Sequence, residues 1–326
     1  MSSESQVPTT RLIPGPGHDA PLGILLKVLS VTLFVTMFAC IKAVGEAVPV
    51  GEKVFFRSVF ALPPILLWVS LQRGGAVERL ATSNPWGHLR RGLAGVSAMG
   101  FGFFAIGLLP FSEVVAIGYA APLFATLLAA LLLGERLRVY RLGAIALGLI
   151  GVLLVLSPRL GLIEAGETAD RLQLLGAGAA LAAAVLSAFA QVFARGLVAT
   201  ETTASVAFWF TITSSVCGLA TLPLGWVVPA AGHLALLVAA GVLGGTGQIL
   251  LTESYRHAEL AVIAPFDYTS ILLSLAFGRF VFAETPTPTV LGGAALVVIA
   301  GLFILYRERR LGLERARARA ASPTQT

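Results

Sequence analysis

The sequence predicts an all-α polytopic membrane protein, with ten transmembrane helices arranged as two inverted five-helix repeats. Only 12% of the 326 residues are charged and 56% are hydrophobic, whereas a soluble domain carries about 25% charged residues. Apolar blocks of about 18 or more residues, each long enough to cross about 30 Å of hydrocarbon, recur along nearly the whole chain. The alternating segments of about ten residues that a membrane β-barrel would need are not seen. The segment from Tyr119 to Leu156 is echoed from Tyr268 to Tyr306.

Proline, glycine and charged residues mark the ends of the expected spans. Pro49, Pro110 and Gly134 lie in connections of the first half, and Pro223 and Pro286 lie in connections of the second half. These residues interrupt helices, so they delimit the apolar blocks. The first five spans are expected at about 22–44, 52–71, 90–109, 113–133 and 139–156. The second five are expected at about 172–196, 204–222, 232–254, 260–281 and 288–306.

The internal repeat is defined by matched positions. Tyr119 precedes Glu135 by 16 positions, and Tyr268 precedes Glu284 by the same number. Each repeat holds five spans, an odd number, so the second copy enters the membrane from the opposite side. Two inverted halves are the usual architecture of alternating-access carriers, which bind their substrate at the interface between the halves.

The basic residues predict the orientation of the chain. Placing the amino terminus in the cytoplasm puts most arginines of the short connections inside, together with those of the tail RERRLGLERARARA. Cytoplasmic loops carry an excess of Lys and Arg, so both termini are expected in the cytoplasm. This orientation accounts for the net charge of +6, and no nucleic-acid partner is expected. The predicted parts are a cytoplasmic tail over 1–21, a first repeat over 22–156, an external linker over 157–171, a second repeat over 172–306 and a basic cytoplasmic tail over 307–326.

Polar side chains inside the spans are candidates for substrate binding, because they are expensive in hydrocarbon. Arg57 lies about one turn inside the second span, where its planar donor fork either faces headgroups or enters a cavity to hold an anionic or polar group. Gln191 and Gln248 lie in the sixth and eighth spans, toward the cytoplasmic half. We expect these three side chains to contact the substrate. Lys27 and Arg91 lie nearer the inner surface and are expected to reach the headgroups.

Two carboxylates are candidates for gating or coupling. Glu253 lies in the eighth span, and Asp267 follows Pro265 in the ninth. The proline predicts a kink beside Asp267. Either carboxyl group could carry a proton; the alternative is an ion pair with Arg195 or Arg256 that closes a cytoplasmic gate.

Tyr119 and Tyr268 form a symmetric pair of aromatic residues, one in each repeat. A flat ring with a polar tip suits contact with a planar heterocycle. We therefore expect both tyrosines in the substrate site, although aromatic residues at helical spacing also serve simple packing.

Motifs for other functions are absent from the sequence. There is no G-x-x-x-x-G-K-[ST] segment for a nucleotide-driven pump and no G-x-S-x-G nucleophile motif. The four histidines are scattered and do not form a metal-binding pair. Neither an enzymatic activity nor a cofactor or metal is expected. Cys40 and Cys217 lie in apolar segments and are expected to be buried thiols.

The closing segments of the two repeats resemble the EamA-type carriers of the drug/metabolite transporter superfamily. The matching segments are LLLGERLRVYRLGAIALGLIGVLLVL and FAETPTPTVLGGAALVVIAGLFIL, the second with alanine in place of the glycine before Glu284. Arg57 in FFRSVFALPP is similar to an arginine of that family early in the second span. The resemblance covers about residues 22–306, and it specifies the superfamily better than the substrate.

This resemblance implies a bacterial inner-membrane carrier with a central cavity between the repeats, in which Glu135 and Glu284 act as hinge or cap residues. The start of the first repeat is similar to a proteobacterial branch that includes riboflavin importers and S-adenosylmethionine uptake carriers. We expect a secondary transporter of a small organic metabolite, with uptake of riboflavin or a similar heterocyclic vitamin as the first hypothesis. S-adenosylmethionine uptake and export of amino acids or other metabolites are the alternatives, and a channel or a non-transporting membrane scaffold is the alternative of another class. The transport direction, the coupling ion and homodimer formation stay open.

Overall fold

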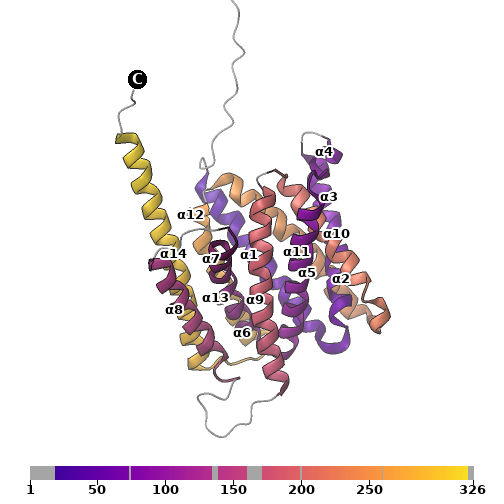
Figure 1. Ribbon diagram of the computed structural model, residues 1–326. Coiled ribbons are helices and arrows are strands. Elements are labelled where there is room, and N and C mark those ends of the chain that lie inside the picture. The colour runs from indigo at the N-terminus through magenta and orange to yellow at the C-terminus, as the bar shows by residue number, and fades with distance from the viewer. Residues whose placement is uncertain are drawn as a thin grey trace, which may run out of the picture.

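The regular secondary structure is helical throughout the part of the chain that is described. The computed structural model describes residues 19–72, 75–133, 139–159, 171–198, 200–258 and 260–321. Figure 1 shows the helices packed side by side in one bundle, with α8 (Val139–Leu156) and α14 (Pro288–Ala321) together at one side of it. The all-helical class predicted from hydropathy is confirmed.

The two halves of the chain contribute similar sets of helices. The first half forms α1 (Ala20–Val44), η1 (Gly45–Ala47), α2 (Val50–Val59), α3 (Leu62–Leu71), α4 (Ala76–Leu80), α5 (Pro85–Leu108), α6 (Phe111–Gly118), α7 (Ala120–Leu133) and α8. The second half forms α9 (Arg171–Val198), α10 (Thr203–Leu219), η2 (Leu222–Leu224), α11 (Ala231–His257), α12 (Leu260–Ile263), η3 (Ala264–Tyr268), α13 (Thr269–Phe280) and α14.

Eight helical stretches of the described residues are long and apolar enough to cross a membrane. They correspond to eight of the ten predicted spans, and three of them join neighbouring helices, α1 with η1, α2 with α3 and α6 with α7. The seventh predicted span is α10, whose 17 residues extend over only about 25 Å. The ninth is divided among α12, η3 and α13. Hydropathy and length therefore support eight of the spans directly. The other two, the seventh and the ninth, are helical segments at the predicted places.

Prolines account for two of the breaks within spans. Pro63 and Pro64 open α3, directly after the last turn of α2. Pro265 opens η3, so a 3-10 segment interrupts the ninth span beside Asp267, at the place where the kink was predicted. Proline cannot donate a backbone hydrogen bond and its ring clashes with the preceding turn, so it is tolerated at the start of a helix and ends a preceding one.

The helices of the two repeats pair in a symmetric pattern. α1 packs against α11 and α5 packs against α9, so the first and third spans of each repeat contact the third and first spans of the other. The equivalent fifth spans, α8 and α14, also pack together. At their crossing a Cβ atom added to Gly151 would lie 2.7 Å from the carbonyl oxygen of Gly293, so glycine permits the close approach of the backbones. This is the pairing that a two-fold axis between the repeats produces.

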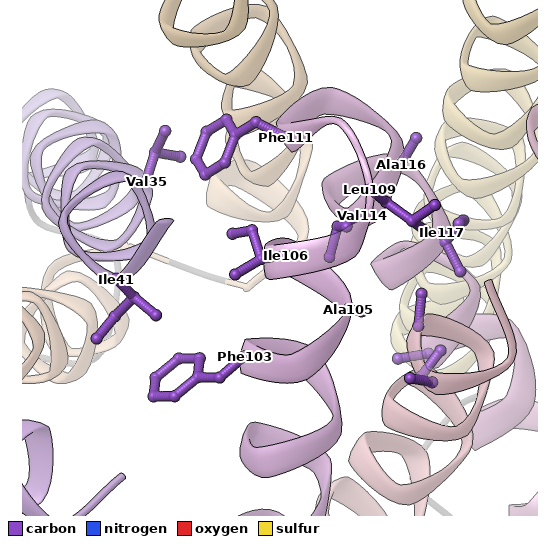
Figure 2. Close-up of a cluster of buried hydrophobic side chains, with 14 of the residues drawn as sticks. Val35, Ile41, Phe103, Ala105, Ile106, Leu109, Phe111, Val114, Ala116 and Ile117 are labelled. Atoms are coloured by element: carbon purple, nitrogen blue, oxygen red, sulfur yellow. The ribbon is translucent and has the colours of Figure 1, made fainter. Parts of the chain in front are cut away.

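A buried apolar cluster joins α1, α5 and α6 near one end of the bundle. Figure 2 shows Phe103 and Ile106 on α5 facing Val35 and Ile41 of α1, with Phe111 at the start of α6. Phe103 and Ile106 are 1% exposed and Phe111 is fully buried. This packing holds the turn between α5 and α6, where the third and fourth spans meet, against the first span.

Candidate functional site

A central cavity of about 490 Å³ lies between the two repeats, a volume in the usual range of small-molecule sites. Its walls come from α1, α2, α5 and α6 of the first repeat and from α9, α10, η3 and α13 of the second. Most of its lining is apolar or aromatic, including Phe34, Phe38, Met99, Phe103 and Phe210. The polar side chains in its lining are Arg57, Tyr119, Ser187, Asp267 and Ser270.

Arg57 reaches the cavity from the last turn of α2. Its side chain is buried, with a residue exposure of 7%, and its Nε atom lies 3.5 Å from the Sδ atom of Met37. A Cβ atom added to Gly244 of α11 would lie 3.1 Å from the Nη2 atom of Arg57, so this glycine leaves room for the guanidinium group. The arginine that was a candidate ligand from sequence thus lines the cavity.

The two tyrosines meet across the repeat interface. The rings of Tyr119 and Tyr268 stack with their centroids 4.8 Å apart. The Tyr119 hydroxyl donates a hydrogen bond to the backbone carbonyl of Asp267 and lies 2.6 Å from the hydroxyl of Ser270. Tyr119 lines the cavity, whereas Tyr268 supports the Tyr119 ring and points its hydroxyl group toward Gly301 of α14.

Asp267 forms an ion pair with Lys27. The Lys27 Nζ atom lies 2.7 Å from a carboxylate oxygen of Asp267, and the Lys27 residue is only 1% exposed. The prediction that Lys27 reaches the headgroups is therefore wrong: its side chain turns into the bundle, because a carboxylate lies within reach there. The Asp267 side chain is 42% exposed and lines the cavity.

The other candidate residues lie outside the central cavity. Gln248 lines a smaller cavity of about 40 Å³ that also includes Arg57. Gln191 is in the lining of neither cavity, and it lies in the C-terminal half of α9. Glu253 pairs with Arg256 one turn away on α11, with 3.0 Å between Oε1 and Nη1.

A polar cluster that the sequence did not indicate lies at the end of the bundle where α1 ends and α6 begins. The Glu284 carboxylate accepts a hydrogen bond of 2.8 Å from the backbone N–H of Phe111 and lies 3.0 Å from Lys42 Nζ. Lys42 also donates to the carbonyl oxygens of Ile106 and Leu109. Glu284 of the second repeat thus caps a helix of the first, which fits the cap role that the resemblance implied for it. Glu135 lies outside the described residues.

A second cross-repeat contact lies at the same end. The guanidinium group of Arg159 donates two hydrogen bonds to the carboxylate of Glu113, at 3.0 and 2.7 Å. Such bidentate pairs are among the stronger side-chain contacts. Arg159 also donates to Gln173 of α9, so this arginine links the segment after α8 to both repeats.

At the opposite end, Glu201 joins the two repeats through the segment before α5. Its Oε1 atom accepts hydrogen bonds from the Thr82 hydroxyl at 3.0 Å and from the Ser83 backbone N–H at 2.9 Å. Its Oε2 atom lies 3.6 Å from the Nε2 atom of His88. Burial raises the pKa of Glu201, but these hydrogen bonds and the nearby histidine outweigh burial and hold the pKa below its usual value.

We expect Glu201→Gln to lower the melting temperature by a few degrees at pH 7, because an amide keeps the geometry but loses the charge-assisted hydrogen bonds. The folded-state pKa lies below the unfolded value of 4.5, so this stabilisation is present above pH 4.5 and fades as pH falls through the folded-state value. Thermal unfolding in detergent micelles from pH 7 to pH 4 should show the two proteins converging. Glu78→Gln, at an exposed position of α4, is the control; an unchanged gap at pH 4 would contradict the assignment.

Comparison with known proteins identifies the repeats. Residues 21–157 and 174–306 each match the EamA-like transporter family. A pseudopaline exporter of Pseudomonas aeruginosa is 29% identical over 85% of this chain and 94% of its own length. A riboflavin transporter of Rhizobium johnstonii is 30% identical over 78% of this chain and 79% of its own, and an S-adenosylmethionine uptake transporter of Rickettsia prowazekii is 26% identical over 82% and 87%. A solved crystal structure with 23% identity covers 89% of this chain and 98% of its own, with a TM-score of 0.60, which shows a shared fold.

Proposed function

Because this multi-pass membrane protein belongs to the EamA-like transporter family, we propose that it is a secondary carrier. It moves a small organic metabolite across the bacterial inner membrane by alternating access of its two repeats. The observation that supports this most directly is the central cavity, whose walls come from both repeats. A site at the interface between repeats can open to either side as one repeat moves against the other.

The first substrate hypothesis is a heterocyclic, vitamin-like solute such as riboflavin. The aromatic lining of the cavity and the stacked tyrosines suit a planar ring. Relatives of comparable similarity carry the names of a riboflavin transporter, an S-adenosylmethionine uptake transporter and a pseudopaline exporter. S-adenosylmethionine uptake and export of amino acids or other metabolites are therefore the alternatives, and a channel or a scaffold is the rival of another class.

We assign Arg57, Tyr119 and Gln248 to direct substrate contact, with Tyr268 holding the Tyr119 ring. Gln191 would reach the substrate only in another conformation of the carrier. The pairs Asp267–Lys27 and Glu253–Arg256 would act as gating or coupling contacts. In the proposed orientation, with both termini in the cytoplasm, the Lys42–Glu284 contact would lie at the periplasmic end and would hold that end closed.

Counterflow into liposomes containing the purified protein tests the proposal. Vesicles preloaded with unlabelled riboflavin should accumulate labelled riboflavin transiently above its equilibrium level. Parallel vesicles with S-adenosylmethionine and a set of amino acids test the alternatives. Transient accumulation of any one solute identifies a carrier and its substrate class together, whereas equilibration at a rate proportional to concentration would favour a channel.

A further inference from the structure

Two arginines share a side pocket of the central cavity. Arg57 of α2 and Arg91 of α5 both line the cavity of about 40 Å³ that contains Gln248. This pocket lies among helices on one side of the bundle, α2, α5, α10 and α11, which pack against one another (Figure 1). Arg57 and Phe210 line both cavities, so the pocket adjoins the central cavity.

Neither arginine forms an ion pair with any carboxylate of the described residues. The contact with Met37 is the one hydrogen bond of the Arg57 guanidinium group in that part of the chain. The Nε and Nη1 atoms of Arg91 are buried and without a hydrogen-bond partner among the same residues. Placing two cations without a carboxylate partner in a membrane interior costs free energy. A bound anion in the pocket that they share would lower this cost.

The pocket holds both guanidinium groups in place. The Arg91 guanidinium group lies over the Phe210 ring, with its Cζ atom 3.9 Å from the ring centroid. Gly95 permits this arrangement, since a Cβ atom there would lie 2.8 Å from the ring. Gly244 leaves similar room for Arg57. Guanidinium groups fixed in this way can bind an oxyanion with paired N–H donors.

We propose that this pocket binds an anionic group of the transported molecule, so that the substrate is a heterocycle carrying a carboxylate or phosphate. This inference rests on the proposed carrier function. The ring occupies the aromatic central cavity and the anionic group enters the side pocket, whose volume of about 40 Å³ has room for roughly two or three waters. Asp267 is already paired with Lys27, so the two arginines carry the uncompensated charge of the site.

Two pairs of solutes that differ by one anionic group test the proposal with the unmodified protein. Uracil is compared with orotate, which adds a carboxylate, and riboflavin with riboflavin 5′-phosphate, which adds a phosphate. Binding to the purified carrier in detergent is measured by thermal stabilisation over a range of solute concentrations. We expect at least one anionic member to bind about tenfold or more tightly than its neutral partner, and the pair that shows this distinguishes carboxylate from phosphate.

Variants then assign the preference to the arginines. Arg91→Gln and Arg57→Gln should each bring the ratio of affinities close to one, because each removes a guanidinium group of the pocket and so weakens binding of the anionic member. Arg91→Lys keeps the charge without the planar fork and should retain part of the preference. Arg90→Gln is the matched control, because Arg90 is exposed on the same helix.

Equal binding of neutral and anionic members, or no binding of either anionic compound, would overturn the anion pocket. These outcomes are separate from failure of the carrier proposal. Counterflow of riboflavin or S-adenosylmethionine, found together with equal binding of the neutral and anionic members, would leave the carrier function standing and remove the pocket from substrate binding.

Discussion

Lys27→Met is expected to destabilise the protein strongly, because it leaves the Asp267 carboxylate without its cation inside the bundle. The two charged atoms are 2.7 Å apart, and the Lys27 side chain is 2% exposed. Removing one partner of a fully buried pair costs about 3–5 kcal/mol. The Asp267 side chain is 42% exposed, so solvation offsets part of this cost and we expect a smaller loss, about 1–3 kcal/mol.

The double variant Lys27→Met/Asp267→Asn separates a structural role from a gating role. It removes both charges, so most of the lost stability should return. Chemical denaturation in detergent measures stability, and counterflow of the same preparation measures transport. A stable double variant with transport reduced about tenfold or more assigns the pair to gating or coupling, whereas full transport would leave it a purely structural contact. Glu253→Gln, which removes a pair whose cation is exposed, should change stability by less than about 1 kcal/mol.

Hydropathy predicted the positions of the helices well, because each crossing segment must be apolar over a fixed length. The span predicted over 139–156 coincides with α8, and the break of the α-helix at Pro265 follows from the chemistry of proline. The repeat predicted that the cavity would lie between the two halves. These features depend on local composition and on self-similarity, which a single sequence contains.

The directions of long basic side chains were harder to predict, since depth alone does not say which face of a helix a residue occupies. Lys27 lies on the buried face of α1 together with Gly23 and Ser30. Arg91 similarly has Gly87 and Gly95 one turn before and after it on α5. Small residues at this spacing mark a face that packs against other helices. A basic residue on the same face is therefore expected to point into the bundle and not toward the headgroups.

Contacts between distant segments leave no comparable pattern in a single sequence. Lys42 and Glu284 are 242 positions apart. The residues around Lys42 in the sequence do not indicate a contact with Glu284, and those around Glu284 do not indicate one with Lys42. The family resemblance suggested a cap at Glu284, but the capped helix and the paired lysine depend on how the repeats pack.

Lys42→Met is expected to open the α1–α6 end of the bundle, because Lys42 joins three segments there. Its ammonium group contacts the Glu284 carboxylate and the carbonyl oxygens of Ile106 and Leu109. Hydrogen bonds to charged groups contribute about 1.5–3 kcal/mol each. If one such contribution stabilises only the closed conformation, its loss raises the open population roughly tenfold to a hundredfold.

Thiol labelling of a cavity residue measures that population. Val114 lies on α6 in the lining of the central cavity, so Val114→Cys in a background of Cys40→Ser and Cys217→Ser reports access to it. A membrane-impermeant thiol reagent applied to right-side-out vesicles should label this cysteine at least about tenfold faster when Lys42→Met is added. Arg90→Met, at an exposed position near the start of α5, is the matched control and should leave the rate unchanged, because α5 begins at the opposite end of the bundle. Equal labelling with and without Lys42 would show that closure at this end depends on the apolar packing of Phe103, Ile106 and Phe111, and the ion pair would then be a consequence of closure and not its cause.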